Sequence, residues 1–217
     1  YNITLDEFKY IFLWEYYHRL LGRIIGIAFL FPFIYFLIKK VFTNNYFYKF
    51  LVIFLFILLQ GFVGWFMVKS GLTENVSVSH YRLAMHLFLA FVILTQIFWY
   101  FKNLITKRNK PFFNFSYSFI SMKLFIFFIF LQIIIGAFVS GLDAGRIYQT
   151  WPLMNESFYP NDLVDVSFFS LIYFKEHGFV QFIHRNLAYL IFINFVFIGY
   201  KIYKEKIKDL YKIYLIL

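Results

Sequence analysis

Five apolar stretches, each close to 20 residues or longer, recur along the chain and restrict it to one class of structure. They cover residues 14–38, 48–68, 82–101, 119–139 and 179–200. A helix of about 20 apolar residues is long enough to cross the hydrocarbon core of a bilayer. Charged residues make up only 15% of the 217 positions, against about 25% in soluble domains. The sequence therefore predicts an all-α integral membrane protein, a polytopic helical bundle.

The two ends of the sequence carry further signals. A sixth apolar segment begins near residue 210, and the chain does not begin with Met. We therefore expect a fragment that lacks material at both ends, and we find no cleavable signal-peptide pattern at its start. The stretch "TLDE" (4–7) matches a Thr-x-x-Glu capping box, so the first helix should begin there, ahead of the first apolar stretch.

Basic and acidic residues alternate between successive loops. Thirteen of the 21 Lys and Arg lie in segments 39–49, 102–123 and 201–212. Nine of the 11 acidic residues lie in 1–15, 69–80 and 141–177. Because basic loops stay on the cytoplasmic or matrix side, residue 1 should begin outside. A net charge of +10 would suggest nucleic acid as the partner of a soluble protein, but these cations flank spans, so we expect no nucleic-acid partner.

Three histidines, His18, His86 and His184, lie near the outer ends of inward-running stretches and hence at a similar depth. Polar groups are expensive within a bilayer, so each indicates a functional site. A buried histidine hydrogen-bonded to a neighbouring helix is the alternative, and three at one depth weaken it. His80 and His177 lie in outer loops or at helix entrances, where a solvated histidine is the better interpretation.

Each of the three histidines has the same two kinds of neighbour. An arginine lies within one turn in each case: Arg19, Arg82 and Arg185. A small residue follows four positions later: Gly22, Ala90 and Ala188. Small residues let a flat surface approach a helix closely, although they also serve helix packing. The pattern is suggestive of a flat ligand rather than specific to one.

Haem matches this pattern well. It is flat and apolar, its iron binds imidazole, and its two carboxylates can pair with arginine. Zinc is less favoured, because the chain has no Cys and no acidic residue joins two of these histidines at the usual ligand spacing. A proton-relay channel would use the histidines but would not explain the small residues.

Two segments around histidines repeat, "EYYHRLLG" (15–22) and "QFIHRNLA" (181–188), 166 residues apart. The spacing fits duplication of a four-helix unit if one helix precedes residue 1. The halves differ three residues before the histidine, where Glu15 can ionise and Gln181 cannot. Glu15 can act as a base or stabilise positive charge, or it can simply pair with Arg19 at i+4. The difference favours chemistry in the first half and electron transfer in the second.

Five segments carry a family resemblance. They are "EYYHRLLGR" (15–23), "QGFVGWFMVKSGL" (60–72), "VSHYRLAMHL" (78–87), "GLDAGRIYQTWPLM" (141–154) and "VQFIHRNLAYL" (180–190). Together they resemble haem A synthase, most closely the type of mitochondria and alphaproteobacteria. The resemblance implies eight helices in two pseudosymmetric four-helix bundles, of which this chain would cover helices two to six and the start of seven.

The resemblance also implies a division of the chain. Residues 1–101 would belong to the N-terminal bundle, which holds the substrate haem, and its first helix would be missing. Residues 102–118 would form a basic inner loop. Residues 119–217 would belong to the C-terminal bundle, which holds the cofactor haem, and its last helix would be missing, together with the second ligand of that haem.

The implied reaction is oxidation of the C8 methyl of haem O to the formyl of haem A, for cytochrome c oxidase. It would proceed by two hydroxylations of one methyl and loss of water from the diol. By resemblance, His18 and His86 would hold the iron of haem O, Glu15 would be the catalytic carboxylate, and His184 would ligate the iron of a haem b cofactor. From spacing, Arg19 and Arg82 are candidate propionate partners for the substrate haem, and Arg185 for the cofactor haem.

Location and partners follow from the same resemblance. We expect a bacterial plasma membrane or mitochondrial inner membrane, with the histidine sites toward the periplasmic or intermembrane face. Haem O synthase or an electron-transfer protein is an expected partner, and a homo-oligomer is left open. One rival is a bis-histidine cytochrome b that only passes electrons, which leaves Glu15 and the 141–154 motif without a purpose. A second is a proton-coupled transporter, which predicts activity without haem.

Overall fold

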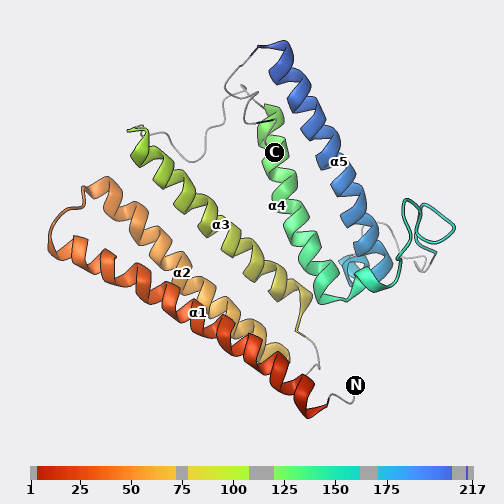
Figure 1. The fold of residues 1–217 in the computed structure, drawn as a ribbon, viewed down its shortest axis with the longest axis horizontal. Helices are drawn as coiled ribbons and strands as arrows, with labels where there is room; N and C mark the ends of the chain where they lie inside the picture. The colour runs from red at the N-terminus through yellow and green to blue at the C-terminus, as the bar shows by residue number, and fades with distance from the viewer. Residues whose placement is uncertain (1–3, 72–77, 108–119, 162–170, 207–213, 215–217) are drawn as a thin grey trace. The chain divides into compact units, whose positions relative to one another are not determined.

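The computed structural model describes residues 4–71, 78–107, 120–161, 171–206 and 214. The long helices in these ranges are α1 (Leu5–Ile38), α2 (Asn44–Gly71), α3 (His80–Ile105), α4 (Ile120–Gly141) and α5 (His177–Lys204) (Figure 1). All five are long and apolar enough to cross a membrane. The prediction of five spanning helices is therefore confirmed. The sixth segment, predicted from near residue 210, lies outside the described residues apart from Tyr214.

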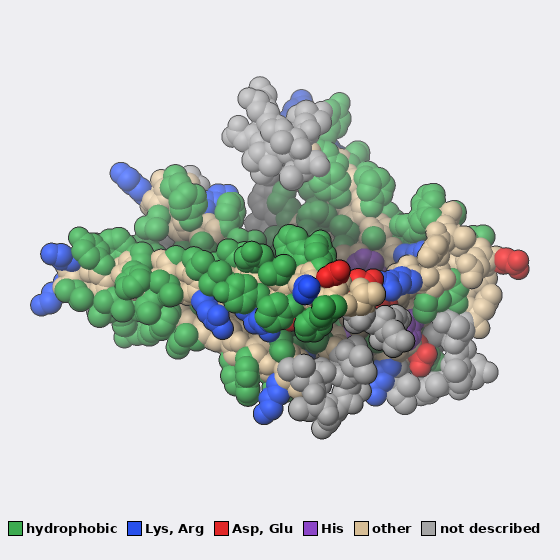
Figure 2. Space-filling view, turned by 60° about the horizontal axis from the view of Figure 1, so that its bottom comes forward, with side chains coloured by type: hydrophobic (Ala, Val, Ile, Leu, Met, Phe, Trp, Pro, Cys, Tyr) green, Lys and Arg blue, Asp and Glu red, His purple; other side chains and the backbone are tan. Residues whose placement is uncertain are grey.

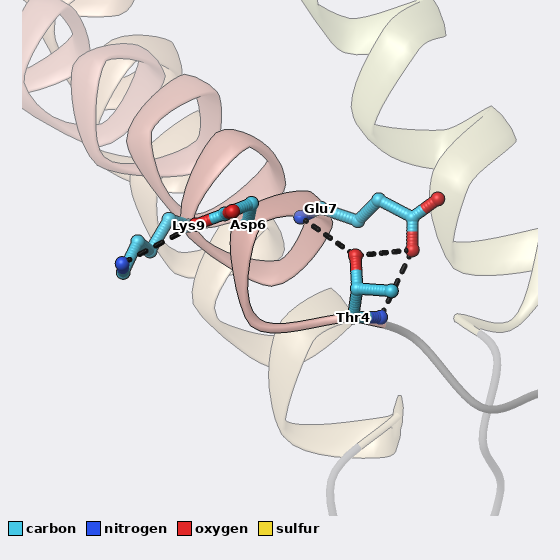
Figure 3. A network of polar contacts seen from close by, with 4 residues as sticks. All are labelled: Thr4, Asp6, Glu7 and Lys9. Atoms are coloured by element: carbon cyan, nitrogen blue, oxygen red, sulfur yellow. Dashed lines mark hydrogen bonds and ion pairs between the residues drawn. The ribbon is translucent and has the colours of Figure 1, made fainter.

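Helix α1 begins with the predicted capping box (Figure 3). Thr4 is the N-cap, and its hydroxyl oxygen accepts a hydrogen bond of 3.4 Å from the Glu7 backbone N–H. The Glu7 carboxylate accepts in return from the Thr4 backbone N–H at 2.9 Å and from its hydroxyl at 2.8 Å. The two residues of the box thus provide hydrogen-bond acceptors for backbone N–H groups that have no partner within the first turn of a helix. The helix then continues for 34 residues and includes Pro32.

Contacts divide the chain into two compact units. One comprises residues 1–65 and 92–108, and the other comprises residues 66–91 and 109–217. The first unit therefore contains α1 and most of α2, while the second contains α4 and α5 with the start of α3. The predicted division at residues 101 and 118 concerns the bundles of a longer protein, and it stays a prediction.

Phenylalanine rings join α1 to α2 in the first unit. The Phe29 and Phe54 rings stack with centroids 6.2 Å apart, and Phe33 lies 5.9 Å from Phe54. Near the start of α2, the Lys49 ammonium lies over the Tyr46 ring at 5.1 Å. Helix α1 has no buried residue in this structure. The abundance of Phe in the sequence thus serves packing here, and many other apolar side chains of α1 are exposed.

The second unit has a core between α4 and α5, which lie side by side (Figure 1). Its buried members are Ala84, Ile135, Ala137, Phe138, Val180 and Leu187. Elsewhere, hydrophobic side chains cover long stretches of the exposed helix surfaces (Figure 2). Such extended apolar surface is unstable in water and suits contact with lipid or with further helices.

A glycine permits a close approach between α3 and α4. A Cβ placed on Gly141, the last residue of α4, would lie 2.8 Å from the His80 Cβ and 2.9 Å from the His80 Cα. Both distances are far below van der Waals contact, and one of the clashing atoms belongs to the backbone. The start of α3 can therefore pack here only against a residue without a side chain.

Replacing Gly141 with alanine should destabilise the protein by about 1–3 kcal/mol, because the added methyl group forces the two helices apart. Gly145→Ala is the matched control, since its Cβ would meet Val139 at an ordinary 3.8 Å. Thermal unfolding of the full-length protein in detergent measures both changes. Equal midpoints for the two variants would contradict the close approach at Gly141.

Candidate functional site

His184 of α5 lies against one face of α4. The side-chain amide nitrogen of Gln132 lies 3.2 Å from the His184 Nε2 and 3.2 Å from the His184 backbone oxygen. A Cβ on Gly136 would lie 3.2 Å from the His184 Cε1. Positions 132 and 136 are one turn apart and share a helix face. Gln132 and Gly136 therefore form the surface of α4 against which the imidazole packs.

The second ring nitrogen of His184 has no such partner. Its Nδ1 is buried and has no hydrogen-bond partner among the described residues. A buried polar group left unpaired costs about 1–3 kcal/mol, so it calls for an explanation. The alternative role, a buried histidine hydrogen-bonded to a neighbouring helix, therefore accounts for the Nε2 of His184 but not for its Nδ1. A ligand-binding role remains the better interpretation.

Arg185, the next residue, holds the loop that follows α4. One guanidinium nitrogen donates to the backbone oxygens of Thr150 at 2.8 Å and Leu153 at 3.3 Å, and the other donates to that of Tyr148 at 2.6 Å. The buried Gln181 amide also donates to the Tyr148 oxygen, at 2.7 Å. Backbone carbonyls carry no net charge, so these bonds position the guanidinium without neutralising it.

The loop itself is ordered by internal contacts. The Thr150 hydroxyl donates to the Leu153 oxygen at 2.9 Å and accepts from the Asn155 N–H at 2.7 Å. The rings of Phe158 and Tyr159 pack edge-on against Phe182 of α5. The motif at 141–154 therefore builds a structured cap against the N-terminal part of α5, beside His184.

Arg185→Gln should release this cap, because it removes three charge-assisted bonds to the loop. We expect faster tryptic cleavage after Arg146, whose exposed side chain lies in the loop. Arg23→Gln, which removes the same charge from α1, is the control and should leave the cleavage rate unchanged. Equal protection of the wild type and Arg185→Gln would show that the three bonds do not hold the loop.

His86 and Arg82 lie on α3, in the same unit. The His86 side chain is half-buried. Arg82 donates to the Phe66 backbone oxygen at 3.0 Å, and its guanidinium carbon lies 3.8 Å from the centre of the Phe66 ring. Arg82 is thus held by a hydrogen bond and a cation–π contact.

Glu15, His18 and Arg19 are exposed on α1, in the other unit. The Glu15 carboxylate lies 3.7 Å from the Arg19 guanidinium, and their side chains are 59% and 42% exposed. The i,i+4 ion pair that we gave as an alternative role is therefore present. Ion pairs this exposed contribute only about 0–1 kcal/mol to the stability of the fold, so Glu15 adds little to stability through this pair. The joint binding of one haem by His18 and His86 stays a prediction.

The face of α1 one turn beyond His18 is open. A Cβ on Gly22 would meet nothing within 4 Å, and the same holds for Gly26. Among the described residues, no neighbouring helix packs against these glycines. Beside His184, by contrast, the small residue in contact with the ring is Gly136 of α4, while Ala188 is exposed.

Sequence reasoning missed two residues and misjudged a third. Gln132 and Gly136 were overlooked, although a polar and a small residue four apart in an apolar stretch repeat the signal used for the histidines. The solvated interpretation holds only in part for His80: it is the first residue of α3 and half-buried, but its ring packs edge-on against Phe138 and its Nε2 is buried.

The described histidines suit haem better than a bare ion. Among the residues that the structure describes, no three His, Cys, Asp or Glu side chains gather to hold a metal. Haem asks less of a protein, because the porphyrin supplies four of the iron's ligands and histidine completes the set. Three features of this site fit that requirement. They are the unpaired Nδ1 of His184, the glycine beside its ring (Gly136) and the positive charge of the adjacent Arg185.

This chain resembles known proteins along its whole length. A family model described as cytochrome oxidase assembly protein (COX15-CtaA) matches residues 1–217. The chain belongs to this family. The resemblance found from the five segments is thereby confirmed, and the cytochrome oxidase assembly family assignment covers the whole chain.

Three relatives illustrate the similarity. "Heme A synthase" of Pelagibacter ubique is 44% identical over 208 residues, which is 95% of this chain and 60% of that protein. The proteins of the same name from Rickettsia bellii and Flavobacterium psychrophilum are 40% and 38% identical, over 98% and 92% of this chain. The chain covers 64% and 59% of their lengths. No solved structure matches it significantly.

Proposed function

We propose that this chain is part of a haem A synthase, an oxidoreductase that converts the C8 methyl of haem O to a formyl group for cytochrome oxidase. The observation that carries the proposal is 44% identity over 95% of the chain to a protein named "Heme A synthase". Its spanning helices and the histidines on them, each with a cation and a small residue nearby, support it. The relatives are longer than this chain, so the activity belongs to the full-length protein.

In the second half, His184 holds a haem b cofactor, which when bound supplies a route for electrons. Gly136 keeps the ring in place on α4, since a side chain there would press on the Cε1. Arg185 brings an unneutralised positive charge beside the histidine, suited to a propionate. Arg185 and Gln181 also hold the outer loop over this end of α5, which limits the entry of water.

In the first half, His18 and His86 hold haem O as the substrate, and Arg19 and Arg82 pair with its propionates. The open face at Gly22 admits a flat ring system beside His18. Glu15, one turn from His18, stabilises the positive charge that develops as the methyl is oxidised, or takes a proton from incoming water. The equivalent position in the second half is Gln181, whose buried side-chain amide cannot ionise and instead holds the loop.

We further propose that the sites face the outer side of a bacterial plasma membrane or mitochondrial inner membrane. The charge alternation of the loops supports this orientation. Haem O is hydrophobic and must reach the site through the bilayer. A haem O synthase or an electron-transfer protein in the same membrane is therefore the expected partner.

Pigment extraction tests the function. The full-length protein is produced in a host that makes haem O but no haem A, and extracted haems are separated by chromatography. Haem A in this sample, absent from a host with an empty vector, supports the synthase. Bound haem b with haem O left unchanged would instead identify a bis-histidine cytochrome that only passes electrons.

A further inference from the structure

Three of the five long helices end in the same backbone geometry and with the same residue type. Lys40 after α1, Lys107 after α3 and Lys206 after α5 have φ angles of 52°, 50° and 52°. The backbone N–H of each lysine donates to the carbonyl oxygen three residues earlier, at 3.1, 3.2 and 3.2 Å. In each helix the lysine therefore occupies the left-handed position that closes the last turn.

Lysine is an uncommon residue for this position. Glycine is usual there, because a Cβ collides with the backbone in the left-handed conformation. A lysine near a helix C-terminus gains from the helix dipole, but this gain is smaller than the left-handed penalty and does not account for the choice. After α4, which runs in the opposite direction, the left-handed residue is Asp143, with a φ of 53°. Among the helix ends that the structure describes, lysine therefore occupies this position on one side of the membrane only.

Positive charge accumulates at this end of the first unit, which holds the C-terminal ends of α1 and α3. Segments 39–49 and 102–107 contain five lysines and neither Asp nor Glu. The acidic residues in the ranges of this unit, Asp6, Glu7 and Glu15, all belong to the first half of α1. The lysines of the two segments thus have no carboxylate near them along the chain.

Two aromatic rings from different helices hold one of these lysines. The half-buried Lys49 has its ammonium 5.1 Å from the centre of the Tyr46 ring of α2 and 5.5 Å from that of the Tyr100 ring of α3. Such cation–π contacts position the ammonium but leave its charge in place. Lys49 therefore brings the charges of α2 and α3 together.

Exposed apolar side chains adjoin the lysines. Ile38, Val41 and Ile105 are 70%, 62% and 66% exposed. A ligand at this end therefore meets cations and hydrocarbon next to each other. Free phosphate, a nucleic acid or an acidic peptide would match the cations alone, whereas an anionic phospholipid matches both. We propose that residues 38–49 and 100–107, here named the lysine end, bind the head-group phosphate of an anionic phospholipid.

The closed turn after α1 also removes groups that would repel a phosphate. The Val41 backbone N–H donates to the Phe36 carbonyl oxygen at 3.1 Å, and the Lys40 N–H donates to that of Leu37. A helix otherwise ends in open carbonyl oxygens, which carry partial negative charge. The left-handed lysine thus pairs these oxygens and adds a cation at the same point.

Quenching of tryptophan fluorescence by brominated lipids tests the site. Trp99 precedes Tyr100, and its signal in the full-length protein is obtained by difference from Trp99→Phe. The protein is placed in phosphatidylcholine bilayers that contain a small share of either brominated phosphatidylglycerol or brominated phosphatidylcholine. We expect Trp99 to be quenched more strongly by the phosphatidylglycerol. Equal quenching by the two lipids would overturn the proposal.

A double variant tests the two left-handed lysines. Each lysine near a membrane surface contributes about 5-fold to the affinity for anionic lipid, so Lys40→Gly with Lys107→Gly should lower the lipid preference roughly 25-fold. Because glycine suits the left-handed position, the thermal midpoint in neutral detergent should not fall. Lys9→Gln, which removes a lysine near the start of α1, is the control and should keep the preference. An unchanged preference in the double variant would contradict the assignment.

Two salts of equal ionic strength separate the lipid from free phosphate. Sodium chloride should weaken the preference by screening, and sodium phosphate should weaken it to the same extent. A larger loss in phosphate would identify a free anion as the ligand and overturn the lipid assignment. This inference goes beyond the proposed function and needs no haem, so pigment extraction and lipid preference succeed or fail independently.

Discussion

Replacing His18 with alanine in the full-length protein should abolish the conversion of haem O into haem A. Alanine has no group that binds iron, and His18 stands beside the open face at Gly22 where a flat ring can lie. Its side chain is exposed on α1, so little of the fold depends on it. We therefore expect loss of retained haem O and of haem A while the folded protein is still produced. Chromatography of extracted haems measures both.

His177→Ala is the matched control for this prediction. It removes an imidazole from the first residue of α5, outside the proposed ligand set. Haem A should be made by this variant at the rate of the wild type. Normal haem A from His18→Ala would exclude His18 as a substrate ligand. Equal loss in both variants would point to a general defect in folding or membrane insertion.

Glu15→Gln should lower the turnover number about 100-fold or more while haem O remains bound. Positioned acid–base groups contribute roughly 10²–10⁴ in rate, and the amide can neither take a proton nor carry negative charge. The change keeps the shape of the side chain and removes only an ion pair in which both members are at least 42% exposed. Stability should therefore change little, and turnover with haem O reports the loss.

Two further variants separate catalysis from ion pairing. Glu7→Gln removes a carboxylate from the same helix but leaves the oxygen that caps Thr4, so it should keep full activity. Arg19→Gln breaks the same ion pair from the other side and should weaken binding of haem O rather than turnover. If Glu15→Gln and Arg19→Gln lower the same parameter equally, Glu15 acts only as the partner of Arg19.

Several features of the fold follow from the sequence alone. Each predicted apolar stretch coincides with one of the five long helices, apart from residue 119, which lies outside the described residues. A span must satisfy its backbone internally and needs a minimum apolar length. The capping box predicted for α1 is present at Thr4 and Glu7, since a cap depends on residues three apart in the chain. The positions of His86 and His184 near the starts of α3 and α5 follow for the same local reason.

The surroundings of these residues were decided by the tertiary structure. Three such arrangements depend on contacts between separate helices and loops. Gln132 and Gly136 face His184, Arg185 donates hydrogen bonds to three loop carbonyls, and the His80 ring packs against Phe138. Such contacts are set by how each helix is rotated and how far it slides along its neighbour. Nearly every face of these helices is apolar, so the local pattern leaves that rotation open. Only the packing of α3, α4 and α5 determines which side chains meet.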